Sequence, residues 1–239
     1  MIIAPITFTI VTVFSTLGTA MVSAFTGMGG GVLLLSILSF FMAMDRLVPI
    51  HGFIQLISNS SRCFLLRDNI VYKFFVYYAF GAPLGFLAAI YLIKQWDLKN
   101  MALILVVILI LYSIFKPKKL PSFKVPAPGF FIVGVISGVF GVLVGAVGPF
   151  LACFFIRDDL NKKQIVSTKS VLQLYTHLLK IPAFTYLGFN YFDEFYLLLF
   201  ASIAAIIGTK YGVKILEKLD EKTFRTIFKI LLLIAAVRL

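Results

Sequence analysis

Two stretches of the sequence carry polar side chains at one repeated spacing among apolar neighbours. They read HGFIQLISNSSR over residues 51–62 and KSVLQLYTHLLK over residues 169–180. A shift of 118 residues superimposes them and pairs His51 with Lys169, Gln55 with Gln173, Ser58 with Thr176, Asn59 with His177 and Arg62 with Lys180. At about 100° per residue, these five positions fall within an arc of roughly 100° on a helix. We therefore expect two helices that each carry one polar stripe.

The side chains of the two stripes are amides, hydroxyls, imidazoles and cations, which can hold a small anion and release it again. Polar side chains at membrane depth are expensive without a role, so we favour a solute pathway. Two alternatives stay open. The stripes could bridge helices, and Arg62 and Lys180 could extend from the helix ends to the membrane interface. His51 and His177 could carry protons or serve as ordinary hydrogen-bonding partners.

A glycine-rich turn stands about 20 residues before each stripe. The turns read GMGGG and GAVGP, and the same shift of 118 residues joins Gly27 to Gly145 and Gly30 to Gly148. Two independent features in one register indicate a tandem duplication, with halves at residues 1–120 and 121–239.

The apolar segments after the two turns are short. Residues 32–44 and residues 150–156 cannot cross a hydrocarbon core of about 30 Å as helices. We expect two hairpins with their glycine tips inside the membrane, where protein or a water-filled cavity must surround them. Free N–H groups and the positive ends of helix dipoles would then favour an anion.

The composition is that of a helical membrane protein. Of the 239 residues, 61% are hydrophobic and only 13% are charged, about half the charged share of a soluble domain. The mean hydropathy is +1.02, and long apolar runs recur along the chain. The predicted fold is therefore an all-α, polytopic membrane domain in contact with the lipid bilayer.

The net charge of +12 has a topological explanation, because the Lys and Arg residues gather in short loops between apolar runs. We therefore expect no nucleic-acid partner. No metal-binding spacing occurs, so no cofactor is expected, and Cys63 and Cys153 are expected to be free thiols. No nucleophile stands with a base, which argues against an enzyme. The acidic residues fall at expected helix ends and loops, so a carboxylate proton relay is unsupported.

The expected full helices share long apolar stretches between breaks. They cover residues 5–25, 48–66, 70–93, 100–115, 129–144, 164–186, 195–216 and 223–239. Gly81-x-x-x-Gly85 and Gly208-x-x-x-Gly212 allow close helix contacts, which we interpret as internal packing. The basic, proline-rich residues 116–128 separate the halves.

Each half returns the chain through its hairpin and then crosses three times, so the two halves should be inverted relative to one another. Basic loops collect on one side, which we expect to be cytoplasmic, with both termini outside.

The duplicated arrangement resembles the sulfite exporter TauE/SafE family over essentially the whole chain. The resemblance rests on four features of the sequence, namely GMGGG after a first helix, a polar third helix, GxxxG in the next helix and a second copy of this set. The second turn reads GAVGP where the family usually has GGG, and Ser36 stands where the family has a proline. The resemblance implies a transporter of small sulfur-containing or organic anions in a bacterial inner membrane.

The stripes and the resemblance together define a set of candidate substrate-binding residues. They are Gly27, Gly29, Gly30, Gly31, His51, Gln55, Ser58, Asn59, Arg62, Gly145, Gly148, Thr168, Lys169, Gln173, Thr176, His177 and Lys180. The alternatives to anion transport are transport of a different small solute, and a membrane accessory or assembly protein. A homodimer is compatible with the sequence.

A single cysteine placed in residues 116–128 of a cysteine-free variant should be labelled only after intact cells are opened. The reason is that this basic segment is expected on the cytoplasmic side. A cysteine at position 193 serves as the control that reacts from outside. Labelling of the 116–128 cysteine in intact cells would overturn the topology.

Overall fold

The computed structural model describes residues 5–93, 124–143, 145 and 147–238. These residues form nine α-helices and three short 3-10 segments, with no strand among them, which confirms the all-α prediction. The helix expected over residues 100–115 lies outside the described residues, as does most of the segment 116–128.

The helices agree with the predicted ones to within a few residues. The helices are α1 (Pro5–Thr26), α2 (Gly30–Leu38), α3 (Met44–Leu65), α4 (Tyr72–Ile93), α6 (Phe130–Leu143), α7 (Gly148–Cys153), α8 (Lys162–Tyr186), α9 (Phe195–Lys218) and α10 (Glu221–Arg238). The 3-10 segments are η1 (Arg67–Asn69), η2 (Ala127–Gly129) and η3 (Tyr191–Glu194).

The largest differences lie between α2 and α3. The helix α2 ends at Leu38, before the expected residue 44, and α3 begins at Met44, four residues before the expected start. Asp45 therefore lies in the first turn of α3 and not in a loop. A carboxylate at that place is favoured by the positive end of the helix dipole.

The helix α8 begins at a capping box. The Asn161 side chain accepts a hydrogen bond from the Gln164 N–H at 2.9 Å, and the Gln164 side chain accepts one from the Asn161 N–H at 3.0 Å. This reciprocal pair satisfies two N–H groups that would otherwise lack partners, so the start of the second polar helix is fixed locally.

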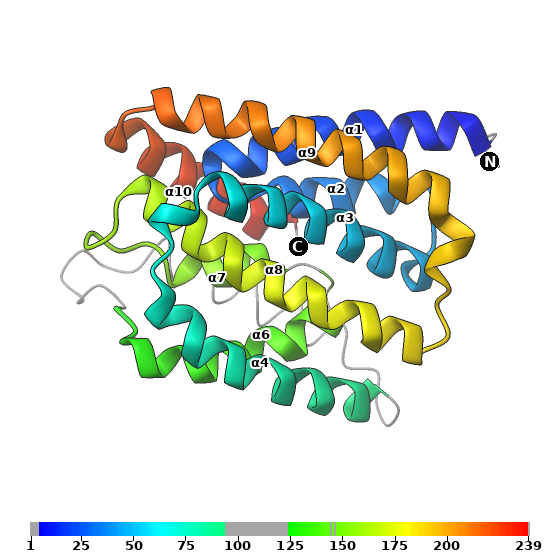
Figure 1. Ribbon diagram of the computed structural model, residues 1–239, viewed down its shortest axis with the longest axis horizontal. Helices are drawn as coiled ribbons and strands as arrows, with labels where there is room; N and C mark the ends of the chain where they lie inside the picture. The colour runs from blue at the N-terminus through cyan, green and yellow to red at the C-terminus, as the bar shows by residue number, and fades with distance from the viewer. Residues whose placement is uncertain (1–4, 94–123, 144, 146, 239) are drawn as a thin grey trace.

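The helices α3 and α8 lie in the middle of the molecule, with α1 and α9 along one edge and α4 and α6 along the other (Figure 1). Within the described residues, the helices long and apolar enough to cross a membrane are Ile6–Thr26, Tyr72–Leu92 and Tyr191–Lys218. They belong to these edges, and they expose apolar side chains such as Phe80. The polar stripes of α3 and α8 are buried between these edges.

Both GxxxG motifs form close helix contacts at these edges. A Cβ added at Gly81 or Gly85 of α4 would overlap backbone carbonyls of α6, and one at Gly208 or Gly212 of α9 would overlap carbonyls of α1. The motifs therefore serve internal packing, as the sequence indicated. Helices far apart in the sequence thus pack together, α1 on α9 and α6 on α4.

The two glycine turns lead into very short helices. With nine residues, α2 is about 13 Å long, and α7 with six residues is about 9 Å long. Neither can cross a hydrocarbon core of about 30 Å. Each pair of helices joined by a turn, α1 with α2 and α6 with α7, is therefore a hairpin with one short arm.

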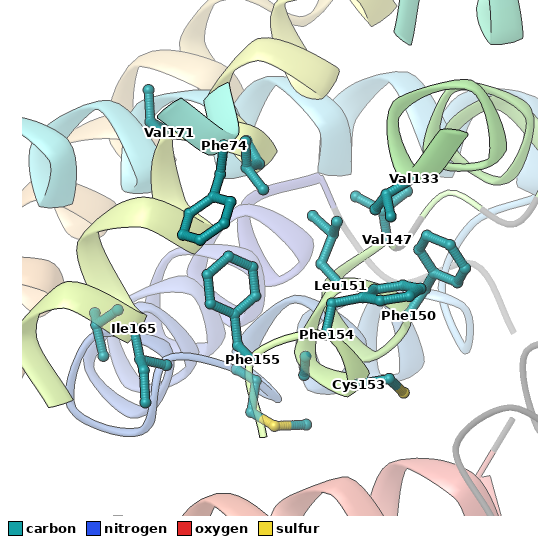
Figure 2. Packing of buried hydrophobic residues seen from close by; sticks show 14 of the residues in the cluster. Phe74, Val133, Val147, Phe150, Leu151, Cys153, Phe154, Phe155, Ile165 and Val171 are labelled. Carbon is teal, nitrogen blue, oxygen red and sulfur yellow. The ribbon is translucent and has the colours of Figure 1, made fainter. Parts of the chain in front are cut away.

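Aromatic side chains anchor the short arm of the second hairpin. The rings of Phe150 and Phe154 lie 5.1 Å apart, and Figure 2 shows them beside Val133 of α6. Phe155 points toward Phe74 of α4, with ring centroids 6.4 Å apart (Figure 2). These apolar contacts hold α7 between the α4–α6 edge and α8.

We expect Gly85→Ala to lower the thermal stability of the detergent-solubilised protein. Its Cβ would overlap the carbonyl of Val135, and overpacking of this kind costs about 1–3 kcal/mol. Gly18→Ala is the matched control, because a Cβ at this α1 position meets no atom within 4 Å. Alanine is the better helix former, so the control should be neutral or stabilising. Size-exclusion chromatography after heating measures the melting temperature of each variant. Equal melting temperatures of Gly85→Ala and Gly18→Ala would contradict the close contact.

Candidate functional site

The two polar stripes face each other across α3 and α8, which run antiparallel. The rings of His51 and His177 lie 6.1 Å apart, and Arg62 Nη1 donates to Ser170 Oγ at 3.2 Å, farther along both helices. All ten stripe residues are at most 7% exposed. Because the helices are antiparallel, His51 lies near Lys180 at one end and Arg62 lies near Lys169 at the other.

A small cavity lies where the stripes meet the two hairpins. Seven predicted residues line it: Gly29, Gly31, His51, Gln55, Gly148, Gln173 and His177. The space available to water centres is about 10 Å³, which is room for about one water molecule. We refer to it as the central cavity. Both glutamines and both glycine turns therefore meet at one small space.

Polar atoms of the central cavity are only partly used. His51 Nε2 lies 2.8 Å from the Gly31 carbonyl oxygen and donates a hydrogen bond to it. In contrast, His51 Nδ1, His177 Nδ1 and Gln173 Oε1 are buried without a hydrogen-bond partner in the described part of the chain. Buried polar atoms of native proteins are nearly always satisfied, so unsatisfied ones at a cavity point to a ligand or water.

Glycine allows the two amides to approach the turns. A Cβ at Gly31 would lie 3.4 Å from Gln55 Oε1, and a Cβ at Gly148 would lie 3.1 Å from Gln173 Nε2. Any larger residue would therefore fill the central cavity from either hairpin.

Lys180 holds the tip of the second hairpin. Its ammonium donates to the Gly145 carbonyl oxygen at 2.5 Å, and its side chain is fully buried. Gly145 has a φ of +81° and packs against Val48, whose Cγ2 would lie 3.3 Å from an added Cβ. The turn is therefore held by one charged hydrogen bond and one apolar contact.

Lys169 holds the tip of the first hairpin in the same way. Its ammonium donates to the Gly27 carbonyl oxygen and lies 5.6 Å from the centre of the Phe228 ring. Gly27 has a φ of +75°, and a Cβ there would lie 3.1 Å from Val166. Val48 and Val166 are separated by the same 118 residues as the two glycines, so one contact is made twice.

Arg62 is buried among neutral partners. Its guanidinium donates to Asn59 Oδ1, Ser170 Oγ and Ser58 Oγ, each at 3.2 Å, while Nε has no partner. Arg62 and Lys180 are both 0% exposed, so the alternative in which they reach the membrane interface is wrong. Among the described residues, no ion pair includes Arg62, Lys169 or Lys180.

Three predicted site residues make contacts between helices and do not line the central cavity. Thr168 accepts a hydrogen bond from the Val71 N–H at 2.9 Å. Thr176 pairs with the hydroxyl of Tyr78 at 2.5 Å, and a Cβ at Gly30 would overlap the Thr19 carbonyl of α1. These contacts join α8 to α4 and α2 to α1.

Several residues at the site lie outside the predicted set. Ser23, Met28, Val32, Val147 and Pro149 complete the lining of the central cavity. Most are apolar and lie outside the stripes, so spacing alone carries no signal for them. Met28, Val147 and Pro149 stand within the two glycine turns, and this position was their available signal.

A larger cavity lies at one end of the molecule. It has a volume of about 370 Å³, and its lining includes Met44, Val48, Leu143, Phe184 and Phe189. We refer to it as the vestibule. Since Val48 also packs against Gly145, the vestibule ends at the turn that Lys180 holds.

An ion pair joins the two halves at the same end as the vestibule. Arg46 Nε lies 2.5 Å from Glu194 Oε1, and Arg46 Nη2 lies 2.9 Å from Glu194 Oε2. The hydrogen bond to Glu194 raises the pKa of Arg46 above its usual value. This two-point contact ties the start of α3 to η3.

Gly145→Ala should cost more stability than Gly188→Ala. Both glycines have positive φ, +81° and +92°, so alanine at either adopts a left-handed conformation at roughly 1–2 kcal/mol. Only Gly145 also meets Val48, since nothing lies within 4 Å of a Cβ at Gly188. In double-mutant cycles of thermal stability, Val48→Ala should couple to Gly145→Ala and add independently to Gly188→Ala. Absence of coupling at Gly145 would show that the turn does not rest on Val48.

Comparison with known families bears on the whole chain. The family described as "Sulfite exporter TauE/SafE" matches residues 12–239. Neither a search of curated proteins nor a search of solved structures gave a match. Because the family match covers nearly every residue, the chain belongs to the TauE/SafE family, whose members are membrane transporters of sulfite or related anions.

Proposed function

We propose that the protein carries a small anion, such as sulfite or a sulfonate, through the central cavity between its two halves. The observation that carries this proposal is the meeting of Gln55, Gln173, both histidines and both glycine turns at one buried cavity. Helix starts at Gly30 and Gly148 support it, because their free N–H groups favour negative charge.

Charge favours an anion over a cation as the substrate. Arg62, Lys169 and Lys180 are fully buried and lack acidic partners within the described segments. Buried charges in membrane proteins normally pair with an opposite charge, and they mark solute pathways. A cation entering between these three side chains would be repelled by their positive charge, whereas an anion would be attracted from both ends.

We further infer that residues 1–120 and 121–239 form inverted repeats. Two reciprocal contacts support this inference, Val48 with Gly145 and Val166 with Gly27. The exchanged edge helices, α1 on α9 and α6 on α4, support it as well. In transporters built from inverted repeats, the substrate binds near the midplane at the interface between repeats.

Transport requires the hairpins to move. A space with room for about one water molecule cannot hold sulfite, which has four heavy atoms. We propose that the chain is closed around its site in this conformation, and that access from the vestibule opens when Gly145 separates from Val48. The vestibule would face the outside of a bacterial inner membrane, with the basic loops in the cytoplasm.

Gln55→Ala and Gln173→Ala should each lower anion flux by roughly tenfold or more. A hydrogen bond to a charged group contributes about 1.5–3 kcal/mol, and each glutamine supplies one or two such donors. The measurement is uptake of labelled sulfite and methanesulfonate into proteoliposomes. Expression and melting temperature should change little, because neither side chain bridges helices by a hydrogen bond in the described structure.

Ser60→Ala and Ser61→Ala are the matched controls on α3. Their hydroxyls bond to carbonyls of their own helix, Leu56 and Ile57, and they lie away from the central cavity. Wild-type flux in both glutamine variants would show that the pathway lies elsewhere. Flux of neither anion in the wild-type protein would favour the alternative of an accessory or assembly protein.

A further inference from the structure

We propose that His51 and His177 form a proton site, so that the central cavity takes up a proton together with its anion. This inference rests on the proposed function, since it concerns the same cavity. It adds a second transported ion and therefore a means of driving the anion against its gradient.

The hydrogen bonding of His51 identifies where a proton can bind. A carbonyl oxygen only accepts, so the 2.8 Å contact with Gly31 requires that His51 Nε2 carries a hydrogen. In the neutral ring, Nδ1 is then an unprotonated acceptor, and it is buried without a partner. This tautomer follows from the hydrogen bond itself.

His177 lies close enough to share the proton site. Its Nδ1 is also buried without a partner, and its ring stands edge-on to that of His51, with centroids 6.1 Å apart. Both rings line the central cavity together with Gln173, whose Oε1 is also an unsatisfied acceptor. His51 Nδ1 and Gln173 Oε1 therefore present lone pairs at a space proposed to hold an anion, and His177 Nδ1 does the same when its neutral ring carries the hydrogen on Nε2.

These acceptors oppose an anion unless a proton accompanies it. An unprotonated imidazole nitrogen presents a lone pair, which repels a negative oxygen. Protonation converts the same atom into a charged donor, and hydrogen bonds to charged groups are the stronger kind. The anion therefore binds best to a cavity that has taken up a proton.

The surroundings set the charge balance of this site. Lys180 of α8 is the charged group that acts on both rings, and its positive charge opposes a proton on either ring until an anion in the cavity offsets it. Its ammonium is occupied by the Gly145 carbonyl. The other helices at the cavity, α1, α2 and α7, bring only Ser23, glycines and apolar residues to it. With no carboxylate among these groups, an anion and a proton that enter together leave the charge of the membrane interior unchanged.

The step is a binding exchange and needs no redox partner. A proton from one compartment binds the lone pair of a histidine Nδ1 as the anion enters. The same proton leaves to the other compartment when the anion leaves, and both rings return to their neutral form. No covalent bond of the anion changes.

The test measures protons and anions in the same proteoliposomes. Labelled sulfite and methanesulfonate report anion flux, and a trapped pH dye reports proton movement. Methanesulfonate remains an anion throughout the working pH range, so protons that move with it come through the protein. We expect about one proton for each methanesulfonate carried by the wild-type protein.

The variants His51→Gln and His177→Gln, singly and together, test the assignment. Glutamine at position 51 can still donate to the Gly31 carbonyl, but it does not titrate. The double variant should carry about one proton fewer per anion than the wild type, whichever anion moves. Ser60→Ala is the control and should keep the wild-type ratio, because its hydroxyl bonds within α3.

Each outcome supports or contradicts a separate claim. If the wild-type protein carries neither sulfite nor methanesulfonate, the proposed function is overturned. Anion flux with an unchanged proton ratio in the double variant overturns the histidine site and leaves anion transport standing. Should the histidine variants fail to fold, calorimetry of methanesulfonate binding to the wild type in buffers of different ionisation heat gives the proton uptake directly. Binding without proton uptake then overturns the inference.

Discussion

Polar side chains that cannot face hydrocarbon are the constraint on which this structure depends. Ten of them lie on α3 and α8, and three of these, Arg62, Lys169 and Lys180, are basic side chains without acidic partners in the described chain. The molecule accommodates them by placing these two helices in its middle, between the apolar edges α1–α9 and α4–α6, with their polar stripes turned inward (Figure 1). Their positions in the molecule therefore follow from the cost of exposing charge to lipid.

Small residues make this arrangement possible at both the edges and the centre. At the edges, Gly85 and Gly212 bring backbones into direct contact, so the shielding helices pack without gaps. At the centre, Gly31 and Gly148 let the two glutamine side chains reach the hairpins. The absence of a Cβ thus lets the helices at the edges pack closely, and at the centre it leaves room for a small polar space.

The hairpin tips are held differently by α3 and by α8. Lys169 and Lys180 both belong to α8, and between them they bind the carbonyls of both tips, Gly27 and Gly145. Their counterparts on α3 act differently, because His51 binds Gly31 within its own half and Arg62 binds side chains. One helix therefore restrains both turns, and His51 keeps a nitrogen available to a ligand.

The sequence by itself determined the helices, the two stripes, the paired turns and the family. These features are local or repeat at a fixed shift, so periodicity and comparison along one dimension reveal them. Only the tertiary structure decided which polar residues meet a cavity and which join helices. Thr176 and Gln173 stand three residues apart, yet one binds Tyr78 of α4 and the other lines the central cavity. Their roles differ because their partners lie far away in sequence, and spacing along a chain does not specify the distances between segments.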